Sequence, residues 1–186
     1  MVRRFILFEA LLFGLCVISP VAIAAQERAP HQGSTAVGMN VGAFAPFDDQ
    51  FDNALVIGAL YEYYLTPRLS LRTDLGWTDP GLTRETDDSL RQIPLTFGLH
   101  YNWERIAWHP FVGAGVGVYF LQGKDNGRTF GESETQPGVN LGGGLEYFFR
   151  PRLSVTGEGR FHAIADTRTG QDPSGFALTV GFKRYW

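Results

Sequence analysis

The sequence predicts an all-β fold, an eight-stranded antiparallel up-and-down transmembrane β-barrel, and three observations support this class. Apolar residues alternate with polar residues or glycine at period two through most of the chain, which is typical of strands whose two faces meet unlike environments. The strand candidates are even in number. The connections between them alternate between short and long, which a soluble β-sandwich has no reason to do.

The first residues have the features of an export signal. Two arginines precede a mostly apolar run from Phe5 to Ile18, and small residues follow it. We therefore expect residues 1–25 to be a cleaved signal peptide, cut after Ala24 or Ala25. The alternative is an uncleaved membrane anchor, which an acidic residue, a glycine and a proline in this segment disfavour.

The mature chain is then of one-domain size. We expect residues 26–33 to be a short periplasmic lead-in and residues 34–186 to be the barrel domain. Cys16 is the only cysteine and lies in the expected signal peptide, so we expect no disulfide and no thiol chemistry. The formal net charge of −3 argues against a general nucleic-acid binder. We find no cofactor or metal motif, and no later apolar run is long enough for a membrane-spanning helix.

The strand candidates follow one another from residue 35 to the end of the chain. Many are close to the roughly 9–11 residues that a tilted strand needs to cross a bilayer. They are Thr35–Phe44, Ala54–Leu65, Leu69–Trp77, Leu90–Trp103, Pro110–Leu121, Val139–Phe149, Leu153–Ala163 and Phe176–Trp186.

The connections between these candidates fall into two classes. An even strand count with short turns at one end and long loops at the other is the layout of barrels with short periplasmic turns and longer extracellular loops. The expected short turns are Thr66-Pro67-Arg68, Glu104–His109 and Arg150-Pro151-Arg152, and the expected long loops are Ala45–Asn53, Thr78–Ser89, Gln122–Gly138 and Ile164–Gly175.

A short motif occurs twice, once in each of two tight hairpins. Residues Glu62–Ser70 match residues Glu146–Ser154 position by position, without a gap. Each copy has a proline in its turn, where the missing N–H breaks no ladder bond. The repeat indicates that the two hairpins have the same local structure.

The register of the first hairpin follows from parity, because residues opposite each other in an antiparallel pair must share a face. Pairing Leu65 with Leu69 places Glu62 opposite Arg72 and predicts an ion pair between them. A slip of two residues would keep the parity and change these partners. In the second hairpin the same register pairs Glu146 with Thr156 and Gly142 with Arg160.

The two strand faces differ in chemistry. One face is apolar, with aromatic residues near the strand ends, as a membrane-facing surface requires. The other face carries glycines and a set of charged residues that we interpret as a structural network inside the lumen, because eight strands enclose only enough room for side chains. Its near balance of charge favours a paired network over a conducting pore. This network comprises Glu62, Arg72, Asp74, His100, Glu146, Glu158, Arg160 and Lys183.

Three other functions are weighed against this interpretation. One is an outer-membrane enzyme that modifies lipid, of the lipid A deacylase or acyltransferase type, and Ser154, Glu158 and His162 share one strand face. Ser154 and His162 would lie on the order of 26 Å apart along an extended strand, which is beyond hydrogen-bond reach. The second alternative is a narrow pore. The third is a soluble, lipocalin-like barrel, which the segregated loops and the apolar outer rows disfavour.

The expected long loops carry more acidic than basic residues. An acidic rim could hold divalent cations that bridge to lipopolysaccharide phosphates, and the alternative is that these are ordinary solvated loops. The acidic residues are Asp48, Asp49, Asp52, Asp79, Glu85, Asp87, Asp88, Asp125, Glu132, Glu134, Asp166 and Asp172, against Arg84, Lys124, Arg128 and Arg168.

The chain resembles the small outer-membrane β-barrel family, OmpA-like or OmpX-like. The features that carry this resemblance are the alternating strands, the two turns of the form aromatic-x-x-Pro-Arg-Leu-Ser, the strand from Pro110 to Gly117 and the terminal Trp186. The resemblance covers essentially the whole mature chain. It implies a monomer in the cell outer membrane, in contact with outer-membrane lipids and lipopolysaccharide.

The resemblance also implies insertion by the barrel-assembly machinery, which in this family reads an aromatic last residue and alternating apolar residues before it. These are Leu178, Val180, Phe182 and Trp186. The expected function is non-catalytic: a structural or surface role in envelope integrity, adhesion or surface interaction, with a lumen filled by side chains.

Overall fold

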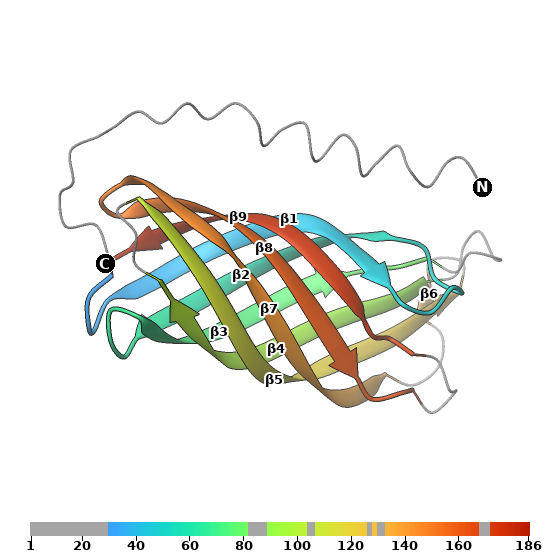
Figure 1. Ribbon diagram of the computed structural model, residues 1–186. Helices are drawn as coiled ribbons and strands as arrows, with labels where there is room; N and C mark the ends of the chain where they lie inside the picture. Colours follow the sequence, from blue (N-terminus) through green and yellow to red (C-terminus); the bar gives the residue numbers. More distant parts are fainter. Residues whose placement is uncertain (1–29, 82–88, 104–106, 126–127, 130–132, 168–171) are drawn as a thin grey trace.

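The computed structural model describes residues 30–81, 89–103, 107–125, 128–129, 133–167 and 172–186, and these form a closed antiparallel β-barrel (Figure 1). The strands are β1 (Thr35–Pro46), β2 (Ala54–Tyr64), β3 (Leu69–Thr78), β4 (Ser89–Asn102), β5 (Trp108–Asp125), β6 (Arg128–Thr129), β7 (Glu134–Arg150), β8 (Leu153–Ile164) and β9 (Gly175–Tyr185).

Every strand of the barrel pairs with its neighbours in an up-and-down order. The spatial order is β4-β3-β2-β1-β9-β8-β7-β5, and pairing of β4 with β5 closes the ring. The two-residue β6 lies outside this ring and pairs with the end of β5. Closure removes the sheet edges that an open sheet would expose. The predicted fold class, an eight-stranded antiparallel barrel, is confirmed.

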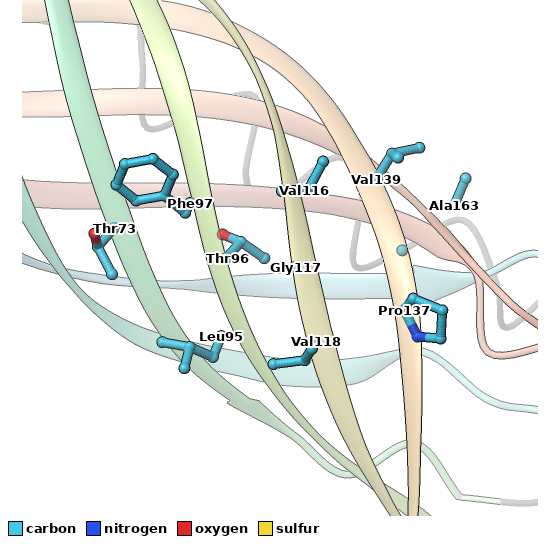
Figure 2. A pocket seen from close by; sticks show the side chains of 11 residues that line it. Thr73, Leu95, Thr96, Phe97, Val116, Gly117, Val118, Pro137, Val139 and Ala163 are labelled. Carbon is cyan, nitrogen blue, oxygen red and sulfur yellow. The ribbon is translucent and has the colours of Figure 1, made fainter.

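The barrel is polar inside and apolar outside. Glu62, Arg72 and Lys183 are only 1–2% exposed, whereas Met39 is 72% and Leu141 62% exposed. Figure 2 shows part of the outer face, where the apolar side chains of β4, β5 and β7 line a shallow hollow of about 660 Å³. An apolar surface of this extent suits contact with hydrocarbon rather than water. Among the described residues, no helix is long and apolar enough to span a bilayer.

The two barrel ends differ in the length of their connections. The short turn after β2 is closed by a hydrogen bond from the Leu65 N–H to the Leu69 carbonyl, at 2.8 Å. Both ends of the described chain lie at this short-turn end, where Thr35 and Trp186 exchange backbone hydrogen bonds. Exposed aromatic residues surround this end, as a membrane-interface girdle would. They are Tyr61, Tyr63, Tyr101, Trp103, Trp108 and Trp186.

The predicted strand boundaries are correct to within about two residues, except around β5 and β7. We expected a loop over Gln122–Gly138, but β5 continues to Asp125 and β7 begins at Glu134. The glycines and charges of this segment are typical of a loop. The extension of β5 is held in a strand by the start of β4, with Leu90 opposite Gly123 and Ser89 opposite Lys124. The early start of β7 pairs with β5, with Glu134 opposite Leu121.

Some expectations lie outside the described residues. They include the signal peptide at residues 1–25 and the first half of the lead-in at residues 26–33. Parts of the expected connections, at residues 82–88, 104–106, 126–127, 130–132 and 168–171, also lie outside them.

Candidate functional site: the charged lumen

A buried lysine joins the two copies of the repeated motif. The Lys183 ammonium donates hydrogen bonds to Glu62 Oε2 at 2.7 Å and to Glu146 Oε2 at 3.1 Å. Each glutamate also accepts a hydrogen bond from the serine eight residues later: Ser70 Oγ donates to Glu62 at 2.5 Å, and Ser154 Oγ donates to Glu146. We call Glu62, Lys183 and Glu146 the lysine triad.

The repeat explains why both glutamates reach the same lysine. In each hairpin the serine lies diagonally across from the glutamate on the lumen face, within reach of a side-chain hydrogen bond. Lys183 is on β9, with β2 two strands away on one side and β7 two strands away on the other. Gly38 on the intervening β1 leaves space for the lysine, since an added Cβ would lie 3.0 Å from Lys183 Cγ.

A second charged cluster lies farther from the short turns. Arg72 contacts Asp74 at 2.6 Å and Glu158 at 2.9 Å, and Arg160 contacts the same two acids at 3.0 and 2.6 Å. The four side chains therefore form a closed ring in which acids and arginines alternate. We call Arg72, Asp74, Glu158 and Arg160 the arginine ring. Shared partners of this kind satisfy several donors of each guanidinium group.

The predicted ion pair between Glu62 and Arg72 is wrong, although the register is right. The two residues lie directly opposite each other in the β2–β3 ladder. No ion pair joins them within the described part of the chain, because each side chain has a better-placed partner. Glu62 turns toward Lys183 and Ser70, and Arg72 donates from both Nε and Nη2 to Asp74 Oδ1, at 2.9 and 2.6 Å.

His100 lies in the lumen but outside both charged clusters. Its ring is stacked on Phe111 with the ring centroids 5.9 Å apart, and no described carboxylate forms an ion pair with it. The other seven residues of the predicted network are members of the lysine triad or the arginine ring. Sequence reasoning did not assign Ser70 or Ser154 to this network, although both belong to the repeated motif and donate to its glutamates.

Apolar layers cover the charged clusters at both ends of the lumen. Toward the short turns, the buried residues Ala36, Tyr64, Phe148 and Tyr185 pack together. The Tyr185 hydroxyl donates to Glu146 at 2.5 Å, so this layer is attached to the lysine triad. Toward the long loops, the second layer consists of Phe51, Leu90, Tyr119, Leu121 and Ile164.

Little free space remains between these layers. A cavity of about 50 Å³ lies beside the arginine ring, between Asn40, Thr96 and His162. This volume is on the scale of one or two water molecules. Near the long loops, Pro80, Pro173 and Phe51 border a space of only about 10 Å³. The described residues thus leave no wide channel through the barrel.

The structure does not assemble the candidate catalytic triad. Ser154 donates a hydrogen bond to Glu146, and Glu158 forms ion pairs with Arg72 and Arg160. The His162 Nδ1 is hydrogen-bonded to the Tyr119 hydroxyl at 2.9 Å. Among the described residues, no group of three or more His, Cys, Asp or Glu side chains is arranged to hold a metal ion.

The residues of the expected assembly signal lie on the last strand and just after it. Val180, Phe182 and Trp186 are 45–53% exposed on the outer face of the barrel, and Leu178 is partly exposed there. This placement leaves them accessible on the outer surface.

The comparison with solved structures finds the same architecture in several outer-membrane proteins. Neisserial surface protein A is 14% identical, with 82% of this chain and 97% of that chain covered and a TM-score of 0.68. The outer membrane protein OprG from Pseudomonas aeruginosa is 11% identical (87% and 99% covered, TM-score 0.67). The attachment invasion locus protein Ail of Yersinia pestis is 12% identical (83% and 99% covered, TM-score 0.60). These identities are low and support the fold alone.

Sequence comparison gives the family. No curated protein matches the chain. The family model described as outer membrane protein beta-barrel domain matches residues 13–184. This range includes all the described strands except the last residue of β9. The match covers most of the chain, and the barrel with its apolar outer face and charged lumen agrees with it. The chain therefore belongs to the outer-membrane protein β-barrel family.

Proposed function

We propose that the protein is a non-catalytic outer-membrane barrel that is sealed along its axis and acts through its surface. The observation that carries this proposal is the filled lumen, in which the lysine triad and the arginine ring are enclosed between two apolar layers. A paired network of this kind has a structural role, and its ionisable groups have their partners inside the barrel.

Measurements of conductance and lipid chemistry test this proposal against the pore and enzyme alternatives. The purified barrel in a planar bilayer should show no stepwise conductance, because the cavity of about 50 Å³ is not a through channel. Incubation with lipopolysaccharide and phospholipid should leave the masses of both lipids unchanged. Regular single-channel steps would favour the narrow pore, and loss or transfer of an acyl chain would favour the enzyme.

The orientation is part of the same proposal. The signal peptide is removed, both termini of the mature chain are periplasmic, and the long loops face the exterior. Trypsin added to intact cells should cut at Lys124 or Arg128, near the far end of β5, or at Arg84 or Arg168, which lie outside the described residues. It should spare Arg68 and Arg152 in the short turns. Cleavage at those two arginines in sealed cells would contradict the orientation.

The surface role is envelope integrity or attachment, by a monomer in contact with outer-membrane lipids and lipopolysaccharide and inserted by the barrel-assembly machinery. The likeness to a protein named for attachment and invasion is consistent with the attachment role. A deletion strain should become sensitive to detergent or lose adhesion, and complementation should restore the defect. A deletion strain with neither change would contradict both roles.

A further inference from the structure

Exposed arginines occur at the short-turn end of the barrel, and the opposite end is acidic. Arg68, Arg150, Arg152 and Arg184 are exposed, and none of them forms an ion pair with a described carboxylate side chain. At the long-loop end the described charges are mostly Asp and Glu. The arginines are therefore available to a ligand that the protein itself does not provide.

Three of these arginines lie together beside β8. Arg150 on β7 pairs with Leu153, which in turn pairs with Arg184 on β9, so the two arginines lie in one row across three strands. Two strand spacings separate their backbones by about 10 Å, which long side chains can bridge. Arg152 is in the adjoining turn, where its carbonyl accepts a hydrogen bond from the Tyr185 N–H at 2.9 Å.

An irregularity in β7 puts Arg150 in this row. The register shifts between Phe148 and Arg150. Phe148 points into the lumen and is 1% exposed, and strict alternation would place Arg150 on the same lumen face. The shift pairs Arg150 with Leu153 and turns it to the outer face, as β-bulges do when they redirect a side chain. No register shift occurs in the β2–β3 ladder.

Aromatic rings place these arginines at the level of lipid headgroups. The Arg184 guanidinium carbon lies 5.2 Å from the centre of the Trp186 ring, and Phe149 contacts Phe182 with ring centroids 6.0 Å apart. Aromatic belts of membrane proteins lie at the interface between hydrocarbon and water, which is where phosphate groups are found. Guanidinium groups bind phosphate with paired, charge-assisted hydrogen bonds.

We propose that Arg150, Arg152 and Arg184 bind the phosphate group of an anionic phospholipid in the leaflet at the short-turn end. This proposal rests on the membrane placement of the barrel and not on the role of its loops. Basic side chains near an anionic membrane surface each contribute about fivefold to lipid affinity. The row of two arginines, with a third in the turn, selects a phosphate that carries net negative charge over a zwitterionic headgroup.

The test uses the fluorescence of Trp186 in the mature barrel, with Trp77, Trp103 and Trp108 replaced by Phe. The parent protein is refolded in phosphatidylcholine vesicles that contain an equal small fraction of brominated phosphatidylglycerol or of brominated phosphatidylcholine. Brominated phosphatidylglycerol should quench Trp186 more strongly, and 0.5 M NaCl should reduce the difference because salt screens exposed charges. Equal quenching by the two lipids, or a difference unaffected by salt, overturns the proposal.

The variants Arg150→Gln and Arg184→Gln should each lower the relative affinity for phosphatidylglycerol by about fivefold. Arg68→Gln is the matched control. It removes the same charge from the same end of the barrel, but its turn lies nearly opposite in the strand order. An equal loss in the Arg68 variant would mean general charge attraction and would overturn the site.

Folding of each variant is checked by its change in gel mobility on boiling. If neither arginine variant refolds, the lipid preference of the parent and its salt dependence decide the question. A barrel that shows the mobility change but no lipid preference overturns the lipid site alone and leaves the proposed function standing.

Discussion

The β2–β3 and β7–β8 hairpins are two copies of one motif. Their lumen faces carry the same residues close to the turns and different residues farther from them. Nearest the turns, Glu62 with Ser70 in the first copy corresponds to Glu146 with Ser154 in the second. Both glutamates bind Lys183. At this level the repeated sequence gives a repeated structure, and the partner comes from a strand that lies between the copies.

One step farther from the turns, the copies have diverged. Arg72 in the first hairpin corresponds to Thr156 in the second, and Gly76 corresponds to Arg160. The acids between these positions, Asp74 and Glu158, correspond to each other. Because each hairpin keeps its arginine on a different side of its acid, the four side chains alternate and close the arginine ring. The glutamates that the two copies share form the lysine triad with Lys183, and the arginine ring depends on the two positions at which the copies differ.

Removal of Lys183 should disrupt the lysine triad, in which the two hairpins are alike. In Lys183→Met, Glu62 and Glu146 remain buried without a counter-charge, and we expect a loss of about 3–5 kcal/mol in the free energy of unfolding. Urea unfolding of the refolded barrel in detergent micelles or lipid measures it.

A triple variant provides the control for this substitution. Lys183→Met combined with Glu62→Gln and Glu146→Gln removes the charges together and should recover most of the loss, since replacing all partners of a buried ion pair costs much less than removing one. A loss below about 1 kcal/mol in the single variant would contradict the buried triad.

A different result is expected in the arginine ring, where the two hairpins differ. Arg72 has its ion-pair partners on β3 and β8. A double-mutant cycle between Arg72→Met and Glu158→Gln should give a coupling of about 1–3 kcal/mol, because the two side chains are in contact at 2.9 Å. The matched cycle with Glu62→Gln, the residue directly opposite Arg72, should give less than half of that coupling. Urea unfolding of the four variants in each cycle measures both. A larger coupling to Glu62 would restore the cross-strand pair that the sequence predicted.

The sequence predicted the faces and the register because both follow from parity, which a local pattern reveals. It did not identify the partners of Arg72, since a long side chain reaches its opposite residue, its diagonal neighbours and, in a narrow barrel, a strand across the lumen. Lys183 could not be assigned to both glutamates before barrel closure was known. The extension of β5 past Leu121 was missed because pairing with β4, which reaches Lys124, overrides the local preference of a glycine-rich segment.

The two glutamates of the triad should not be equivalent. Glu146 accepts hydrogen bonds from Lys183, Ser154 and Tyr185, whereas among the described residues Glu62 accepts them only from Lys183 and Ser70. Glu146→Gln should therefore lower the free energy of unfolding by about 1 kcal/mol more than Glu62→Gln does, in line with one additional charge-assisted bond. Urea unfolding of the two variants side by side measures the difference. Equal losses would show that Tyr185 gains nothing from its contact with a charged acceptor.

The smallest expected effect concerns a glycine on the outer face of the second hairpin. Gly157 corresponds to Thr73 of the first hairpin, so the motif accepts a side chain at this position. A Cβ added at Gly157 would have no atom within 4 Å. Gly157→Ala should therefore stabilise the barrel by about 0.5–1 kcal/mol, because alanine has less backbone freedom to lose on folding.

Gly144, on the lumen face of β7, provides the matched control for the same substitution. A Cβ there would lie 2.0 Å from the Gly157 carbonyl oxygen and 2.9 Å from Phe111 Cζ. The backbone oxygen cannot move aside without disturbing the ladder, so Gly144→Ala should destabilise the barrel by about 1–3 kcal/mol or more. The free energy of unfolding, measured with urea, should thus rise for Gly157→Ala and fall for Gly144→Ala. Equal shifts would show that space at the glycine does not decide the outcome, and the close packing of β7 on β8 would then need another explanation.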